Sequence, residues 1–274
     1  MLSLSLPIIL TLIVLLIATI TDVRKREVPD CLSYSFIAAS LAAALAKSII
    51  DIDSTFIVNS LLGLAVFWII ANLLYYGKFF AGGDAKLLMG IGAAMGIDWA
   101  FLVNLMITGG LYGLLYSFAL AIINFRNVKM EFISESNNFF RKRWTHMVAV
   151  ICLLITFQIL ANHMFRYPLN NIILYTLILM AILAPILLIF AKSVEKTALI
   201  RTIPVGKLTE GDWLVQDIKL DSKTVKATFE GVSKEDLALL KKSVKKVKVK
   251  YGLPFVPAFL MAFIAEILFG NLFL

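Results

Sequence analysis

Apolar runs about as long as a membrane-spanning helix recur along the whole chain, with short polar segments between them. We expect helices at residues 4–20, 31–50, 55–76, 86–97, 100–123, 147–163, 170–191 and 253–273. A helix needs about 20 apolar residues to cross the hydrocarbon core of a bilayer. The first run has no basic start and no small-residue cleavage site, so we expect a retained span rather than a signal peptide.

The run at 86–97 is shorter than the others and follows glycines. We expect it to form a short helix inside the bundle, where polar backbone is tolerated. The pattern therefore predicts an all-α polytopic membrane helix bundle of six to eight spans, one of them short and preceded by glycine.

Residues 193–252 have a different pattern, which predicts a small basic α+β domain in the cytoplasm. Segments 200–205 and 213–220 have the composition of strands. Segment 233–236 has the spacing of a helix capping box, Ser-x-x-Asp. Valines interleaved with lysines at 244–250 predict a closing half-buried strand. The expected layout is a bundle at 1–192, this domain at 193–252 and a C-terminal transmembrane helix at 253–274.

Charge orients the predicted spans. The formal net charge is +8, and residues 192–252 hold 14 Lys/Arg against 8 Asp/Glu. With eight crossings, the basic segments at 24–26, 124–146 and 192–252 all fall on one side, which the Lys/Arg bias assigns to the cytoplasm. A basic segment beside a membrane predicts contact with anionic lipid headgroups. No interleaving of aromatic and basic residues indicates nucleic-acid binding.

Two acids share one depth in this predicted topology. Asp22 ends the first span and Asp84 starts the fourth, both at the cytoplasmic boundary. Two carboxylates in a low-dielectric site share a proton, so the ionised one can deprotonate water while the other donates to a scissile carbonyl. Alternatively, Asp84 is a cap or first-turn acid of its helix, and Asp22 pairs with Arg24 or Arg26.

Neighbouring residues fit such a carboxylate pair, and no metal or cofactor is expected. Gly82 and Gly83 present bare backbone that an extended substrate can approach closely. Lys86 either tunes the ionisation of Asp84 or snorkels to the membrane interface. The chain has two Cys and two His, without the spacing of metal ligands. Two further acids, Asp98 and Glu266, are expected to be structural.

Three segments together resemble a known family. These are Thr21-Asp22 followed by Val28-Pro29-Asp30, then Ala81-Gly82-Gly83-Asp84-Ala85-Lys86-Leu87, and finally Leu253-Pro254-Phe255-Val256-Pro257-Ala258-Phe259. The first two resemble the aspartate motifs of type IV prepilin peptidases and of archaeal preflagellin (prearchaellin) peptidases, including GxGD. The third, with Pro254, Pro257 and Ala258, resembles the proline-containing segment that the presenilin branch of GxGD proteases carries near its catalytic site. Ala81 stands where the motif has its first glycine.

The resemblance implies a membrane aspartic endopeptidase of the archaeal cell membrane, with Asp22 and Asp84 as catalytic residues. Its partners would be preflagellin- or pilin-like precursors, which lose a short basic leader at the cytoplasmic face. Glu27 and Asp30 would then read the basic leader, unless they are solvated loop acids with Asp30 capping the second span. Without substrate, like charges repel, so we expect the two aspartates to rest beyond hydrogen-bond reach.

Two alternatives remain from the sequence. One is a presenilin-like protease that cuts inside the membrane span of its substrate. The other is an ion-coupled transporter or channel component. An ion pathway needs acids at several depths along one bundle, whereas Asp22 and Asp84 share a single depth.

Overall fold

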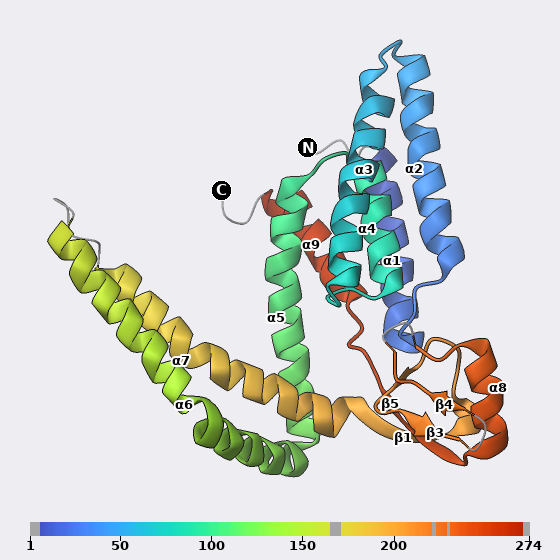
Figure 1. Ribbon diagram of the computed structural model, residues 1–274. Coiled ribbons are helices and arrows are strands. Elements are labelled where there is room, and N and C mark those ends of the chain that lie inside the picture. The colour runs from blue at the N-terminus through green and yellow to red at the C-terminus, as the bar shows by residue number, and fades with distance from the viewer. Residues whose placement is uncertain (1–5, 165–170, 221–222, 229–230, 271–274) are drawn as a thin grey trace. The chain divides into compact units, whose positions relative to one another are not determined.

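The computed structural model describes residues 6–164, 171–220, 223–228 and 231–270 (Figure 1). The described helices are α1 Leu6–Lys25, α2 Asp30–Ile50, α3 Thr55–Tyr76, α4 Gly82–Met95, α5 Trp99–Ile123, α6 Phe125–Met164, α7 Asn171–Val194, α8 Lys234–Ser243 and α9 Val256–Phe269. The described strands are β1 Ile200–Pro204, β2 Trp213–Leu214, β3 Ile218–Lys219, β4 Thr224–Val225 and β5 Lys246–Lys250.

The predicted class, a polytopic helical membrane protein with a small sheet region, is confirmed. Within the described part of the chain, six helices (α1, α2, α3, α5, α6 and α7) are long and apolar enough to cross a membrane. The other two apolar helices, α4 and α9, have only 14 residues each. The chain divides into two compact units, one of Met1–Leu115 with Gly252–Leu274 and the other of Tyr116–Tyr251.

Helix α4 is the centre of the first unit. It packs against α1, α2 and α3, and eight of its residues, more than half of the helix, are buried. Leu87, Leu88 and Ile91 are fully enclosed. Because most faces of α4 contact protein, it does not need the length of a lipid-exposed span. The predicted short helix inside the bundle is therefore confirmed.

Glycines permit the close contact between α3 and α4. A Cβ at Gly63 would strike the carbonyl of Gly92, and a Cβ at Gly92 would lie 2.5 Å from the Gly63 carbonyl oxygen and against Phe67. Small residues commonly let membrane helices approach at the backbone. By contrast, a Cβ added to Gly110 or Gly113 of α5 would meet no described heavy atom within 4 Å, so these two glycines do not serve such a contact.

Several helix ends meet at one end of the first unit. The C-termini of α1 and α3 and the N-termini of α2, α4 and α9 lie there (Figure 1). Short connections at 26–29 and 77–81 join these ends. The arrangement brings Asp22 and Asp84 to the same end, as the predicted topology requires.

The second unit contains an α6–α7 hairpin and the small sheet. Lys192 and Lys196 of α7 pair with Glu135 of α6, and Lys196 also pairs with Glu131. The expectation that 124–146 is a polar segment outside the helices at 100–123 and 147–163 was wrong, because α6 is one helix from Phe125 to Met164. Its polar first half reads as a loop by composition, yet these ion pairs align it along α7.

The sheet follows the predicted pattern closely. β5 lies between β1 and β2, antiparallel to both, while β3 and β4 form a separate hairpin. Val247 and Val249 of β5 are buried, whereas Lys246 and Lys248 are exposed. Ser233 caps α8 by accepting a hydrogen bond from the Asp236 N–H at 3.1 Å, as predicted. The expected strand at 213–220 is instead two short strands in different sheets.

We expect Gly92→Ala to destabilise the first unit, because its methyl group overlaps the α3 backbone. Overpacking of this kind costs about 1–3 kcal/mol, which lowers Tm by a few degrees in a chain of this size. Thermal unfolding in detergent measures the effect. Gly110→Ala is the control, since its methyl meets no described atom and alanine favours helix. Equal Tm values for the two variants would refute the role of the α3–α4 contact.

Candidate active site

Asp22 is a buried carboxylate that links the end of α1 to the start of α9. It lies in the last turn of α1 and is 6% exposed. Its Oδ2 accepts a hydrogen bond from the backbone N–H of Val256 at 2.9 Å. Val256 is the first residue of α9, where backbone N–H groups have no partner within the helix. The Asp22 side chain therefore caps α9, and a negative charge is favourable at this helix end.

Asp84 has a similar position at the start of α4. It is the third residue of that helix and is 8% exposed. Its Oδ2 accepts a hydrogen bond from the Ala81 N–H at 3.1 Å, which is one half of a capping box. Ala81 has φ −76° and ψ 165°, so alanine fits the position of the motif's first glycine without strain.

The two aspartates, 62 positions apart in sequence, belong to one site. They are close enough for an electrostatic interaction between their carboxyl groups. No hydrogen bond joins them in the described structure, and each carboxylate accepts one from a backbone N–H instead. A Cβ at Gly83 would lie 3.1 Å from the Cβ of Val28, so the loop after α1 also touches the first turn of α4.

An aromatic cluster connects the third motif segment to this site. Phe80 lies just before the first turn of α4. The centre of its ring is 5.5 Å from the ring centres of both Phe255 and Phe259. Phe255 also packs against Gly109 of α5, where any Cβ would strike its ring. Pro254 and Ala258 are buried, and Pro257 occupies the first turn of α9, where a missing N–H costs nothing. The segment that resembles the presenilin motif therefore lies beside Asp22.

Arg26 is a site residue that the sequence suggests only as an ion-pair partner of Asp22. Its guanidinium Nη1 donates to the carbonyl oxygen of Gly252 at 2.9 Å. Its backbone has φ +59°, in the left-handed region that commonly ends a helix. The contact holds the end of α1 to the chain just before the proline segment. Its only signal in the sequence is a positive charge four residues after Asp22.

Lys86 and Asp30 form an ion pair with each other rather than acting separately. The Lys86 Nζ lies 2.6 Å from Asp30 Oδ1 and 5.2 Å from the centre of the Tyr34 ring. Lys86 therefore joins α4 to the start of α2, a role that neither predicted alternative included. Asp30 does not cap α2, because the cap position is Pro29. Glu27 is exposed, and no hydrogen bond or ion pair involves it in the described structure.

The other membrane acids lie away from this site. Asp98 accepts a hydrogen bond from the Phe101 N–H at 3.0 Å at the start of α5, and that start lies at the end of the unit opposite the starts of α2, α4 and α9 (Figure 1). Glu266 is in the last turn of α9. Among the described residues, no group of three or more His, Cys, Asp or Glu side chains is placed to hold a metal ion.

Comparison with known proteins yields matches to this part of the chain. Residues 9–124 match the type IV leader peptidase family. A stretch of 79 residues is 30% identical to a preflagellin peptidase of Methanococcus maripaludis, covering 29% of this chain and 34% of that protein. The chain thus matches about a third of the length of this curated relative. No solved structure matches the chain. The resemblance predicted from the sequence is therefore confirmed for residues 9–124, which contain Asp22 and Asp84 and are similar to the type IV leader peptidase family.

Proposed function

We propose that this chain is a membrane aspartic endopeptidase that removes short basic leaders from preflagellin- or pilin-like precursors at the cytoplasmic face of the membrane. The observation that carries the proposal is the burial of Asp22 and Asp84 within electrostatic reach of each other, at one end of the membrane bundle. The similarity of residues 9–124 to leader peptidases supports it. An ion pathway needs acids at several depths, whereas the described helices of the first unit carry acids only in their first or last turns, at Asp22, Asp30, Asp84 and Glu266.

The surroundings of the two acids favour different catalytic roles for them, one as the base and the other as the acid. Asp22 accepts the Val256 N–H, the Phe255 N–H also faces it, and the Arg26 charge is near. Asp84 accepts only the Ala81 N–H in the described structure and is enclosed by the bundle core. We assign Asp22 as the ionised base that deprotonates the attacking water. Asp84 then carries the shared proton and donates it to the scissile carbonyl.

The substrate backbone would reach the acids over the Gly82–Gly83 turn. A Cβ at Gly82 would have only the Tyr75 ring within 4 Å, at 3.9 Å, so this face of the turn is open. The absence of a side chain lets an extended peptide lie against the turn. Binding would also offset the cost of moving the two carboxyl groups from their separate backbone donors into hydrogen-bond contact with each other.

We expect Asp22→Asn and Asp84→Asn each to reduce leader cleavage by at least about 10²–10⁴-fold, the usual contribution of a general acid or base. Asparagine keeps an oxygen for the Val256 or Ala81 N–H, so folding should be retained. The measurement is cleavage of a preflagellin-type precursor in detergent, with sequencing of the new N-terminus.

Asp98→Asn is the matched control for this pair, because it preserves a capping side chain at the distant end. It should cleave at the parent rate, and EDTA should leave the parent rate unchanged. If Asp22→Asn or Asp84→Asn cleaves at the parent rate, the substituted residue is not catalytic. A new N-terminus inside the hydrophobic helix of the precursor would instead indicate intramembrane proteolysis.

We expect Arg26→Gln to lower kcat by about tenfold or more while leaving KM nearly unchanged. The variant loses a charged hydrogen bond to Gly252, a contact of the kind worth about 1.5–3 kcal/mol. It also loses the positive charge near the proposed base. Arg24→Gln removes an equal charge from the same turn, where Arg24 is exposed, and should behave as the parent. Similar losses in both variants would show a general charge effect.

We expect Glu27→Gln to raise KM for a basic leader by a few fold and to have little effect on a neutral leader. An exposed ion pair contributes about 0.2–1 kcal/mol, and salt weakens it. Asp30→Asn breaks the pair with Lys86, so it should affect both leaders equally. If Glu27→Gln discriminates between the leaders as well as the parent does, leader recognition lies elsewhere in the chain.

A further inference from the structure

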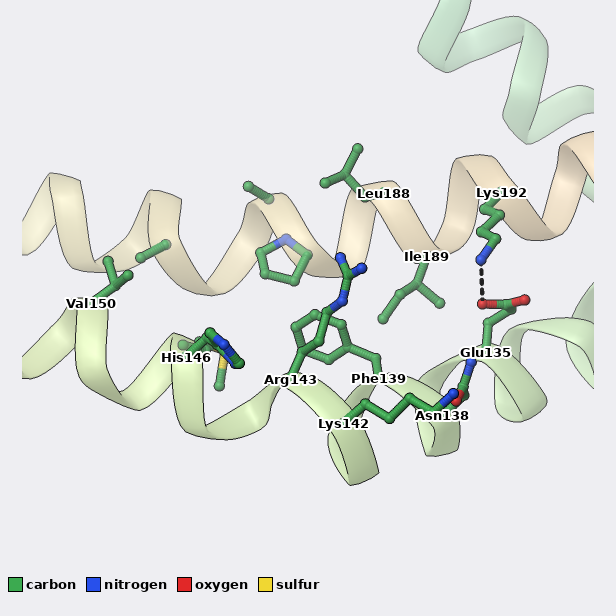
Figure 2. Close-up of a pocket in the computed structure, with 14 residues that line it drawn as sticks. Glu135, Asn138, Phe139, Lys142, Arg143, His146, Val150, Leu188, Ile189 and Lys192 are labelled. Carbon is green, nitrogen blue, oxygen red and sulfur yellow. Dashed lines mark hydrogen bonds and ion pairs between the residues drawn. The ribbon is translucent and has the colours of Figure 1, made fainter.

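A groove of about 570 Å³ lies between α6 and α7, entirely within the second unit (Figure 2). On the α6 side it is lined by cationic and polar residues, including Lys142, Arg143 and His146. On the α7 side the lining is mostly apolar, with Ala181, Leu188 and Ile189 among its residues. The α6 wall therefore combines basic side chains with the apolar Phe139, Met147 and Val150, and the α7 wall is apolar except for Lys192.

The cations of this groove fall into two groups. Lys192, at one end, is paired with Glu135 at 2.9 Å. Lys142, Arg143 and His146 are exposed, and none has a hydrogen bond or an ion pair within the described part of the chain. In Figure 2 the Arg143 side chain extends from α6 toward α7, while Lys142 runs along α6 toward Asn138. The groove thus contains two unpaired cationic side chains and one imidazole.

These side chains lie beside an apolar stretch of membrane helix. Lys142 and His146 follow Glu135 by two to three helical turns, a distance of about 10–16 Å along α6. At that level α7 presents Ala181, Ala184 and Pro185, and its sequence is apolar enough to span a bilayer. Unpaired charge at such a place is costly.

We propose that this groove binds an anionic membrane lipid, with the headgroup phosphate between Lys142, Arg143 and His146. The acyl chain would lie against the apolar wall formed by Leu188 and Ile189 of α7 and Val150 of α6. Guanidinium and ammonium groups are the common partners of phosphate in proteins, and basic pockets between membrane helices bind anionic headgroups. Charge complementarity together with an apolar wall selects a lipid over a small anion, which would use only half of the groove.

The test titrates fluorescent phosphatidylglycerol into the full chain purified in detergent. Lys142→Gln/Arg143→Gln should weaken binding about 30-fold, since two cations near a membrane surface contribute about 2 kcal/mol and about 1.4 kcal/mol is tenfold. Arg126→Gln/Lys129→Gln is the matched control, because it removes two exposed cations from the same helix outside the groove. The control should stay within twofold of the parent.

Competition distinguishes the possible occupants. Unlabelled phosphatidylglycerol should displace the probe, whereas phosphatidylcholine and millimolar inorganic phosphate should not. Displacement by inorganic phosphate would overturn the lipid assignment in favour of a free anion, and equal displacement by phosphatidylcholine would show nonspecific partition. Equal losses in the groove and control variants would reduce the site to diffuse surface charge. A change of oligomeric state in the groove variant alone would identify the groove as a contact between copies.

Discussion

The hydrogen bond from the Val256 N–H to the buried Asp22 carboxylate holds the first unit together at the end that carries Asp22 and Asp84. A carboxylate within an apolar bundle must find donors, and the start of a helix offers N–H groups that have no partner of their own. By meeting that need, Asp22 fixes the start of α9 beside the end of α1, although 234 positions separate the two residues. Phe255 and Phe259 then pack on Phe80 and so position the turn that carries Asp84.

The same principle operates twice in the site. Asp22 faces the N-terminus of α9, and Asp84 lies in the first turn of α4. Each helix end supplies N–H donors and a partial positive charge, which offsets the repulsion between two neighbouring carboxylates. These donors help the bundle to keep both acids buried. The shortness of α4 is part of this arrangement, because the helix begins inside the bundle and places its N-terminus at the site.

The second unit handles charge differently. In the charged part of the α6–α7 hairpin, the two helices neutralise each other's charges. Ion pairs there join Lys192 and Lys196 of α7 to Glu131 and Glu135 of α6. Further along, the cations of α6 face an apolar helix and find no partner among the described residues. A buried acid pair in one unit and an open basic groove in the other thus follow from one constraint. Charge in a low-dielectric setting must be paired by backbone, by side chains or by a ligand.

The sequence by itself determined the elements whose signal is local. Apolar runs predicted the spans, strand-like composition predicted β1, interleaved valines and lysines predicted β5, and the short glycine-preceded run predicted α4. The polar run at 124–146 misled, because its charges resemble a loop unless a partner helix is known to bear matching lysines. Only the tertiary structure decided the contacts of Asp22 with Val256, of Arg26 with Gly252 and of Lys86 with Asp30. The residues of each pair are separated by 56 to 234 positions, so no periodicity encodes them, and they form only when packing around α4 brings the helix ends together.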